Sequence, residues 1–500
     1  MLRLLSTLLT VSLFSSTLSF AEGFISGKPY DKSINLDTSL PPDLHEDLPE
    51  LGDVSQTVLS AQDEQNIAEQ ILAEVAMSDE VLQDAEVVDY LQSLGNRLAA
   101  ASDDKLQTFY FFVVKDNSIN AFAMPGGVIG VHTSLFLSSN SESELASVLG
   151  HEIGHVTQHH LARILAKQKT DTFKNIAGIA VALLVARTNP ELASGALATS
   201  SAAGIQRQLD YTRAHEREAD RVGLSILENA GFDPRGMPAF FTTLQRGSRF
   251  VEGSAPSFLR THPLTSERIS DVENRVAMMP YKQVASSADY YFVRAKLRTN
   301  EGLAQTVIDQ FSHNIQTGRY ANEAAEHYGL AVAMLRKNDV VGASRQIKWL
   351  DDRQIKSAFI ENVKARIAVI QNNPQKVAEQ YASAIKQYPQ NRALVYGYAD
   401  HFLALKQTKE MIALVKAKQA PYPNDAHFYE LLAKAYFIEQ KELLRFQAQG
   451  EAYYRQYNVD KALEQMGFAS KAKDGSFYEK SIVEARLKDL QRLQKLKKQD

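Results

Sequence analysis

The apolar positions in the first part of the chain change their period. Across residues 61–100 they recur every three to four residues, which predicts two amphipathic helices. A β-rich run follows at 109–114. A second apolar run, 120–131, is interrupted by Pro125-Gly126-Gly127, which predicts a turn between two strands. This order predicts a small sheet that follows two helices.

Two longer helical patterns carry the charged motifs. Ser141 and Glu144 have the spacing of a capping box, and the amphipathic run that follows them extends to about residue 169. A second helix is expected at roughly 206–229, after a stretch rich in Gly, Ala and Ser, and a short one at roughly 268–279. The pattern therefore predicts a mostly α domain with a small sheet.

The second half of the chain is compatible with helix almost throughout, and it repeats every 34 residues. Small residues occupy the positions where paired tetratricopeptide helices approach closely. These residues are Ala331, Ala365, Ala399 and Ala433. Such arrays form concave surfaces that bind segments of other proteins. We therefore expect an α-solenoid of tetratricopeptide repeats at 300–490, behind an α+β domain at 56–285.

The N-terminus has the pattern of a secretory signal peptide over residues 1–21. Arg3 precedes an apolar run, and Ser19-Phe20-Ala21 resembles a cleavage site. The alternative, an uncleaved anchor helix, needs about 20 apolar residues without such an ending. Residues 22–55, rich in Pro and acidic residues, are expected to form an extended leader.

Composition narrows the function classes. The chain has 500 residues, a net charge of -4 and no Cys, so nucleic-acid binding is not expected and a zinc site must use His and carboxylates. The apolar segment 176–186 is too short to span a bilayer. We expect it to be a buried helix, with peripheral contact with a membrane as the alternative.

The motif HEIGH places His151 and His155 four residues apart on a predicted helix, so both imidazoles project from one face. This spacing is typical of a zinc site, with Glu152 as the general base of a peptidase. A solvated or buried His pair without metal is the alternative. His159 lies about 12 Å from His151 along a helix, too far to share one ion. A metzincin continuation is excluded, because residues 158 and 161 are Gln and Leu.

The third ligand is expected from the second helix. Glu216 and Asp220 share a face at i, i+4, so Glu216 could bind Zn²⁺ while Asp220 accepts the second N–H of a ligating His. Glu218 points to another side of the helix. His215 is a competing ligand, but it has no carboxylate one turn away. The expected set is one Zn²⁺ per chain, held by two His and Glu216.

Two further residues belong to the predicted site. Arg268 is a candidate cation for the oxyanion of the tetrahedral intermediate. For His262, which precedes Pro263, three interpretations stay open. It could occupy the fourth position at the zinc and hold the enzyme off, it could donate to the oxyanion, or it could cap the next helix.

Taken together, HEIGH, the EREAD motif with Glu216 and Asp220, the NAFAMPGG and THPLTSER segments and the repeats resemble the gluzincin metalloproteases that include HtpX and the CAAX prenyl protease. The similarity is to the periplasmic members that carry repeats, and it covers nearly the whole chain after the signal peptide. It implies that His151, His155 and Glu216 bind zinc, that Glu152 is catalytic, and that Asp220 and Arg268 are supporting residues.

The resemblance also implies partners and control. His262 would be a switch ligand that restrains the protease, and the strand at 120–124 an edge on which a substrate pairs. The substrates would be unfolded or misassembled outer-membrane proteins, and the repeats would dock on the β-barrel assembly machinery and lipopolysaccharide-transport clients.

A rival class is a non-proteolytic tetratricopeptide chaperone or adaptor whose zinc is structural. Four protein ligands that stay bound would favour that class, whereas Glu152 beside a site that can open favours an enzyme.

Overall fold

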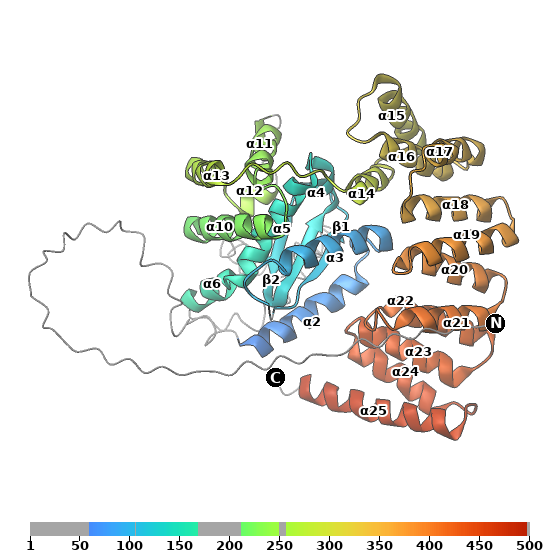
Figure 1. Ribbon diagram of the computed structural model, residues 1–500. Helices are drawn as coiled ribbons and strands as arrows, with labels where there is room; N and C mark the ends of the chain where they lie inside the picture. The colour runs from blue at the N-terminus through green and yellow to red at the C-terminus, as the bar shows by residue number, and fades with distance from the viewer. Residues whose placement is uncertain (1–59, 106, 169–211, 250–256, 498–500) are drawn as a thin grey trace, which may run out of the picture. The chain divides into compact units, whose positions relative to one another are not determined.

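The computed structural model describes residues 60–105, 107–168, 212–249 and 257–497 (Figure 1). The predicted signal peptide, the leader, the segment 176–186 and the first residues of the helix expected at 206–229 lie outside this part of the chain. Among the described helices, none combines the length and the apolar character needed to cross a membrane.

The N-terminal elements are those that the apolar period predicts. Helices α2 (Ala61–Met77) and α3 (Ala85–Ala99) precede a sheet of three strands in the order β1-β3-β2. Strand β1 (Tyr110–Val114) is parallel to β3 (Val128–His132), and β2 (Ala121–Met124) is antiparallel to β3. Strand β2 is therefore an edge of this sheet.

The turn between β2 and β3 is the 3₁₀ turn η1 (Pro125–Gly127), and it depends on glycine. Gly126 and Gly127 have φ values of 71° and 77°, in the left-handed region that side chains disfavour. A Cβ at Gly126 would also lie 2.5 Å from the backbone oxygen of Glu64 on α2. The turn therefore packs directly against α2.

The helix that carries HEIGH is shorter than the pattern predicts. Helix α4 (Thr133–Ser138) leads into α5 (Glu142–Thr157), and α6 (His160–Gln168) follows after a break at His159, whose φ is 50°. Ser141 caps α5 by accepting from the Glu144 amide at 3.2 Å. The Glu144 carboxylate, however, accepts from the Asn140 amide at 3.0 Å, one residue before the cap that a capping box would use.

The second motif helix, α10 (Arg213–Asn229), crosses α5 at very short range. Small residues line the crossing because the two backbones leave little room for side chains. A Cβ added at Gly150 would lie 3.2 Å from the Gly223 carbonyl oxygen, and one added at Gly154 would lie 3.1 Å from the Ala219 carbonyl oxygen. Helices α11 (Gly236–Arg249), α12 (Ser257–Thr261) and α13 (Ser266–Met278) complete this part. The crossing brings the HEIGH face of α5 against the EREAD face of α10.

The segment between the two predicted domains is a packed helix, α14 (Ala288–Arg298). The buried Tyr290 donates its hydroxyl to the Ser139 carbonyl at 2.7 Å, and Arg294 donates to the Leu137 carbonyl at 2.9 Å. Both carbonyls lie at the C-terminal end of α4. Side chains of α14 thus provide donors for main-chain carbonyls at the C-terminal end of α4.

Eleven further helices follow in the described chain: α15 (Ala304–Thr317), α16 (Glu323–Arg336), α17 (Val340–Asp352), α18 (Ala358–Ile370), α19 (Pro374–Gln387), α20 (Arg392–Ala404), α21 (Thr408–Gln419), α22 (Ala426–Ile438), α23 (Glu442–Arg455), α24 (Val459–Lys471) and α25 (Phe477–Lys497). The helices α16, α18, α20 and α22 begin at residues 323, 358, 392 and 426, so successive pairs are offset by 34 or 35 residues. The four alanines that recur every 34 residues, from Ala331 to Ala433, are all buried. The mostly α fold with a small sheet and a helical repeat region is therefore confirmed.

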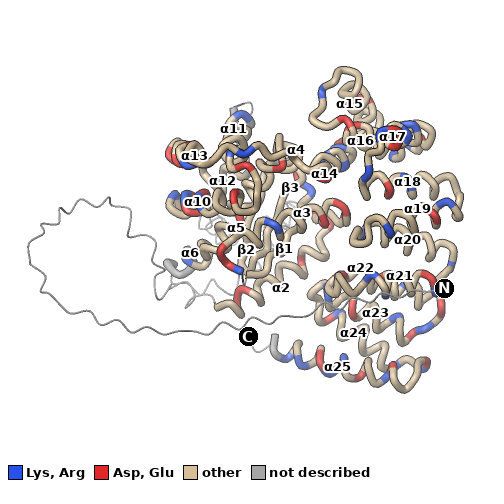
Figure 2. The backbone as a smooth tube through the Cα atoms, in the orientation of Figure 1, with Lys and Arg blue, Asp and Glu red and all other residues tan. Residues whose placement is uncertain are grey.

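Charged residues of both signs lie along these helices, whereas the parallel strands β1 and β3 carry none (Figure 2). The residues of β1 from Phe111 onward and all of β3 are buried. The sheet thus forms part of the core beneath the motif helices.

The crossing can be tested with Gly223→Ala. The added Cβ would lie 3.0 Å from the His151 amide nitrogen and 3.2 Å from the Gly150 carbonyl carbon. Overpacking of this kind destabilises by about 1–3 kcal/mol. We expect a lower free energy of unfolding in urea and a weaker affinity for zinc, because the two motif faces are forced apart.

The matched control is Gly467→Ala in α24, where an added Cβ has no neighbour within 4 Å. Since Ala favours helix over Gly by up to about 1 kcal/mol, this change should be neutral or slightly stabilising. Equal effects of the two substitutions would contradict the importance of the crossing.

Candidate metal centre

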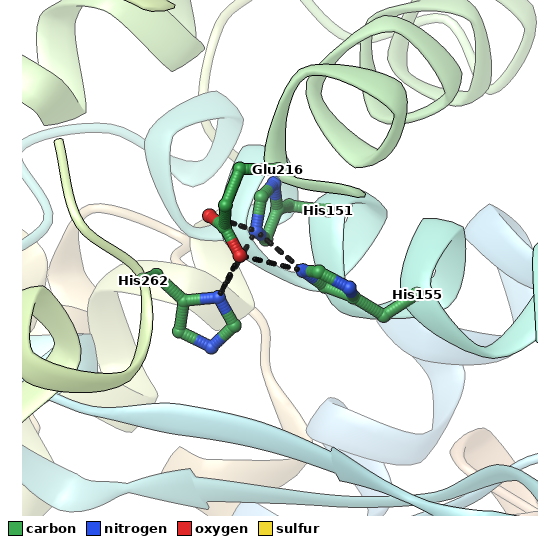
Figure 3. Close-up of side chains that lie close together, drawn as sticks. All are labelled: His151, His155, Glu216 and His262. Atoms are coloured by element: carbon green, nitrogen blue, oxygen red, sulfur yellow. Dashed lines mark hydrogen bonds and ion pairs between the residues drawn. The ribbon is translucent and has the colours of Figure 1, made fainter. Parts of the chain in front are cut away.

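Four buried side chains from three segments converge next to the contact between α5 and α10 (Figure 3). His151 and His155 come from α5, Glu216 from the first turn of α10, and His262 from the segment after α12. One donor atom from each of these residues lies within 4.8 Å of the others. The structure thus brings together the predicted metal ligands, including His262.

The separations between donor atoms fit a small tetrahedral ion. The Nε2 atoms of His151 and His155 are 3.0 Å apart, and a Glu216 carboxylate oxygen lies 3.4 Å from His155 Nε2. His262 Nδ1 lies 3.4 Å from His151 Nε2 and 3.0 Å from Glu216 Oε1. Zinc bonds of about 2.0–2.1 Å give a tetrahedron with edges of about 3.3 Å. The donor set is also the nitrogen and carboxylate set that zinc takes in the absence of Cys.

Glu152 lies on the same turn of α5 as His151 and is fully buried. Its Oε1 atom lies 3.5 Å from His262 Nε2. Burial raises the pKa of Glu152, and the nearby His262 and His151 only partly oppose this rise. A buried carboxylate of raised pKa beside a candidate metal site is suited to accept a proton.

Asp220 and Arg268 form a second layer behind the ligands. Asp220 Oδ1 accepts from His151 Nδ1 at 2.9 Å, the contact that the one-turn spacing from Glu216 predicts. The buried guanidinium of Arg268 binds both Asp220 oxygens at 2.7 Å and Glu216 Oε2 at 2.5 Å. This geometry favours a supporting role for Arg268 over the oxyanion role, because its N–H groups already face carboxylates.

Burial and neighbouring charges shift the pKa values of three side chains in the centre. Burial opposes the charged form of His151, but hydrogen bonds and charges from Asp220 and Glu216 outweigh it and raise the pKa of His151 to about 9. Burial likewise disfavours ionised Glu216, yet His262 and the two motif histidines hold its pKa well below the usual value. For His155, burial dominates and lowers the pKa. The directions of these pKa shifts favour an anionic Glu216 beside a neutral His155, both able to bind a cation.

His262 does not act as the cap of the next helix. Thr265 is the N-cap of α13 and accepts from the Arg268 amide at 3.3 Å. The His262 ring instead stacks on Phe258, with centroids 4.6 Å apart, and turns Nδ1 toward the ligand cluster. The capping interpretation is wrong, whereas a position at the metal agrees with the structure.

Three residues that sequence reasoning set aside or missed also lie here. Glu218, expected on another side of α10, hydrogen-bonds His160, and His160 in turn contacts His155. His215 stacks on His160 instead of joining the ligands. The break between α5 and α6 at His159 places His160 beside His155. The sequence pattern does not predict this break.

The chain matches a family model described as Peptidase family M48 over residues 86–276, which include every residue of this centre. It is 30% identical to the beta-barrel assembly-enhancing protease of Yersinia pestis, over 89% of this chain and 92% of that protein. The corresponding Escherichia coli K12 protein is 28% identical over the same shares. The mitochondrial metalloendopeptidase OMA1 of Arabidopsis thaliana is 31% identical over 38% of this chain and 36% of its own length.

The second layer can be tested with Asp220→Asn, which removes the negative charge between His151 and Arg268. Loss of such an outer partner typically weakens metal binding by 10–100-fold. We expect a loss in this range, measured by competition with a chromogenic chelator.

Asp271→Asn is the matched control, since this aspartate forms an exposed ion pair with Arg275 on α13, away from the ligand cluster. The control should bind zinc as the wild type does. A dissociation constant unchanged in Asp220→Asn would refute the role of the second layer.

Proposed function

Because the chain belongs to the family of beta-barrel assembly-enhancing proteases, zinc metalloproteases of the M48 type, we propose that it cleaves unfolded or misassembled outer-membrane proteins in the periplasm. A chaperone activity that assists assembly of the same proteins accompanies the cleavage. The observation that carries this proposal is the convergence of His151, His155 and Glu216 beside the buried Glu152.

In this proposal His151, His155 and Glu216 hold one zinc ion. When bound, zinc lowers the pKa of a water to about 7 and polarises a carbonyl group. Glu152 accepts a proton from the attacking water and returns it to the leaving amine, so no covalent intermediate with the enzyme is needed. Asp220 holds His151 through Nδ1, and Arg268 keeps Glu216 and Asp220 in place.

His262 has a restraining role in this proposal. As a fourth protein ligand it would complete a closed tetrahedron, the arrangement of structural zinc sites. Substrate hydrolysis requires that position to be free, so His262 must withdraw before cleavage. Its ring is held by stacking on Phe258 and by the main-chain hydrogen bond from its amide to the Phe258 carbonyl.

In this proposal the two halves of the chain have different functions. We assign proteolysis to residues 56–285 and client or partner binding to the repeats at 300–490, after a signal peptide at 1–21 and a leader at 22–55. The repeats would dock on the β-barrel assembly machinery. The names of the relatives in Yersinia pestis and Escherichia coli, which this chain matches over 92% of their length, support the link between proteolysis and β-barrel assembly.

The decisive test is Glu152→Gln with casein as an unfolded substrate. General base catalysis contributes about 10²–10⁴-fold, so cleavage should fall by at least about 10²-fold. Zinc content should stay at one per chain, because Glu152 is not a ligand. Glu273→Gln, an exposed change on α13, is the control and should leave both measurements unaltered. Cleavage by the Glu152 variant at the wild-type rate would contradict the role of Glu152 as general base.

The restraint is tested with His262→Ala. Three ligands remain, so the variant should retain one zinc per chain and digest casein faster than the wild type. An equal or slower rate would instead favour a contribution of His262 to oxyanion binding. A wild type that holds zinc but cleaves nothing, with or without His262, would favour the non-proteolytic adaptor with a structural zinc.

A further inference from the structure

A second histidine lies directly behind the metal ligand His155. His155 Nε2 faces Glu216 and His151, and its other ring nitrogen points away from them (Figure 3). That outer nitrogen, Nδ1, lies 2.9 Å from His160 Nδ1, and both rings are buried. His160 is therefore a partner of the ligand and not itself a member of the ligand set.

Donor counting sets the direction of this hydrogen bond. A His155 ring that binds metal through the lone pair of Nε2 carries its proton on Nδ1 and must donate there. His160 Nδ1 must then accept, so a neutral His160 carries its own proton on Nε2. His160 Nε2 lies 3.0 Å from a carboxylate oxygen of Glu218, which accepts that proton's hydrogen bond.

Glu218 ends the chain of bonds at the protein surface. Its side chain is 28% exposed, and the same oxygen lies 3.3 Å from Arg163 Nη1. The carboxylate of Glu218 is thus held between the His160 imidazole on one side and the Arg163 guanidinium on the other. The negative charge thus reaches His155 through one intervening imidazole.

The break between α5 and α6 makes the contact geometrically available. In a continuous helix, residues five apart point about 140° away from each other, so His155 and His160 would not meet. The left-handed backbone of His159, with φ 50°, turns α6 and directs His160 back toward His155. His215 of α10 packs flat on the His160 ring, with centroids 4.6 Å apart and planes at 21°.

We propose that His160 and Glu218 are positioning residues for the zinc ligand His155, the counterpart of Asp220 for His151. His151 receives its carboxylate directly, whereas His155 receives one through His160. The chain fixes the tautomer and ring orientation of His155 and strengthens Nε2 as a donor to the metal. This inference rests on the proposed function, since it assumes that the centre binds zinc.

The test uses Glu218→Gln in the full-length chain, with Glu228→Gln, an exposed change on the same helix, as the matched control. Zinc affinity is measured by chelator competition, alongside the thermal midpoint of the metal-free protein. We expect Glu218→Gln to weaken zinc binding about tenfold, the lower end of the range for outer partners, without lowering that midpoint. Glu228→Gln should match the wild type.

A double-mutant cycle then separates positioning through His160 from a local structural effect. His160→Leu should weaken zinc binding at least as much as Glu218→Gln, and adding Glu218→Gln to it should have no further effect. His160→Gln, whose amide can both accept and donate, should recover part of the affinity. Additive effects of the two substitutions, or no recovery with Gln, would overturn the proposal.

Failure of this inference is distinguishable from failure of the proposed function. A wild type that binds zinc and cleaves casein, with Glu218→Gln indistinguishable from Glu228→Gln, would refute the positioning chain alone. A chain that cleaves nothing, both as the wild type and as His262→Ala, would refute the proposed function, while the zinc affinities would still decide whether His160 and Glu218 support the metal.

Discussion

The close crossing of α5 and α10 is the constraint on which the site depends. Each helix contributes residues one turn apart, His151 and His155 on α5 and Glu216 and Asp220 on α10. These four can meet only because small residues let the backbones approach to within van der Waals contact. The same helix interface therefore packs the core and positions the side chains of the candidate metal centre.

Burial makes this arrangement demanding. The carboxylates of Glu216 and Asp220, the guanidinium of Arg268 and several imidazoles are almost completely removed from water. Charges in such a place are tolerated only when each is paired and hydrogen-bonded. Arg268 meets this need by binding both carboxylates. Glu152 differs from them, since burial raises its pKa and so favours its role as a proton acceptor.

Much of this was predictable, because it follows from local spacing. One-turn pairs on amphipathic helices located residues that the structure brings together, and Pro125-Gly126-Gly127 located the turn between two strands. The rest depends on tertiary contacts. Arg268 looked like a free cation until its carboxylate partners were known, and Glu218 looked remote because helical spacing says nothing of a neighbouring chain segment. The left-handed His159 has no Gly or Pro to mark it, so the end of α5 was not foreseen.

The packed helix α14 limits how far the protein can be divided. The predicted boundary near residue 285 falls just before this helix, yet Tyr290 and Arg294 donate to carbonyls that end α4. A chain cut there would leave the Ser139 and Leu137 carbonyls without these donors and would uncover the face on which Tyr290 is buried. Helix α14 therefore links the part that carries the metal centre to the helices that follow, and a boundary at residue 285 would cut through these packed contacts.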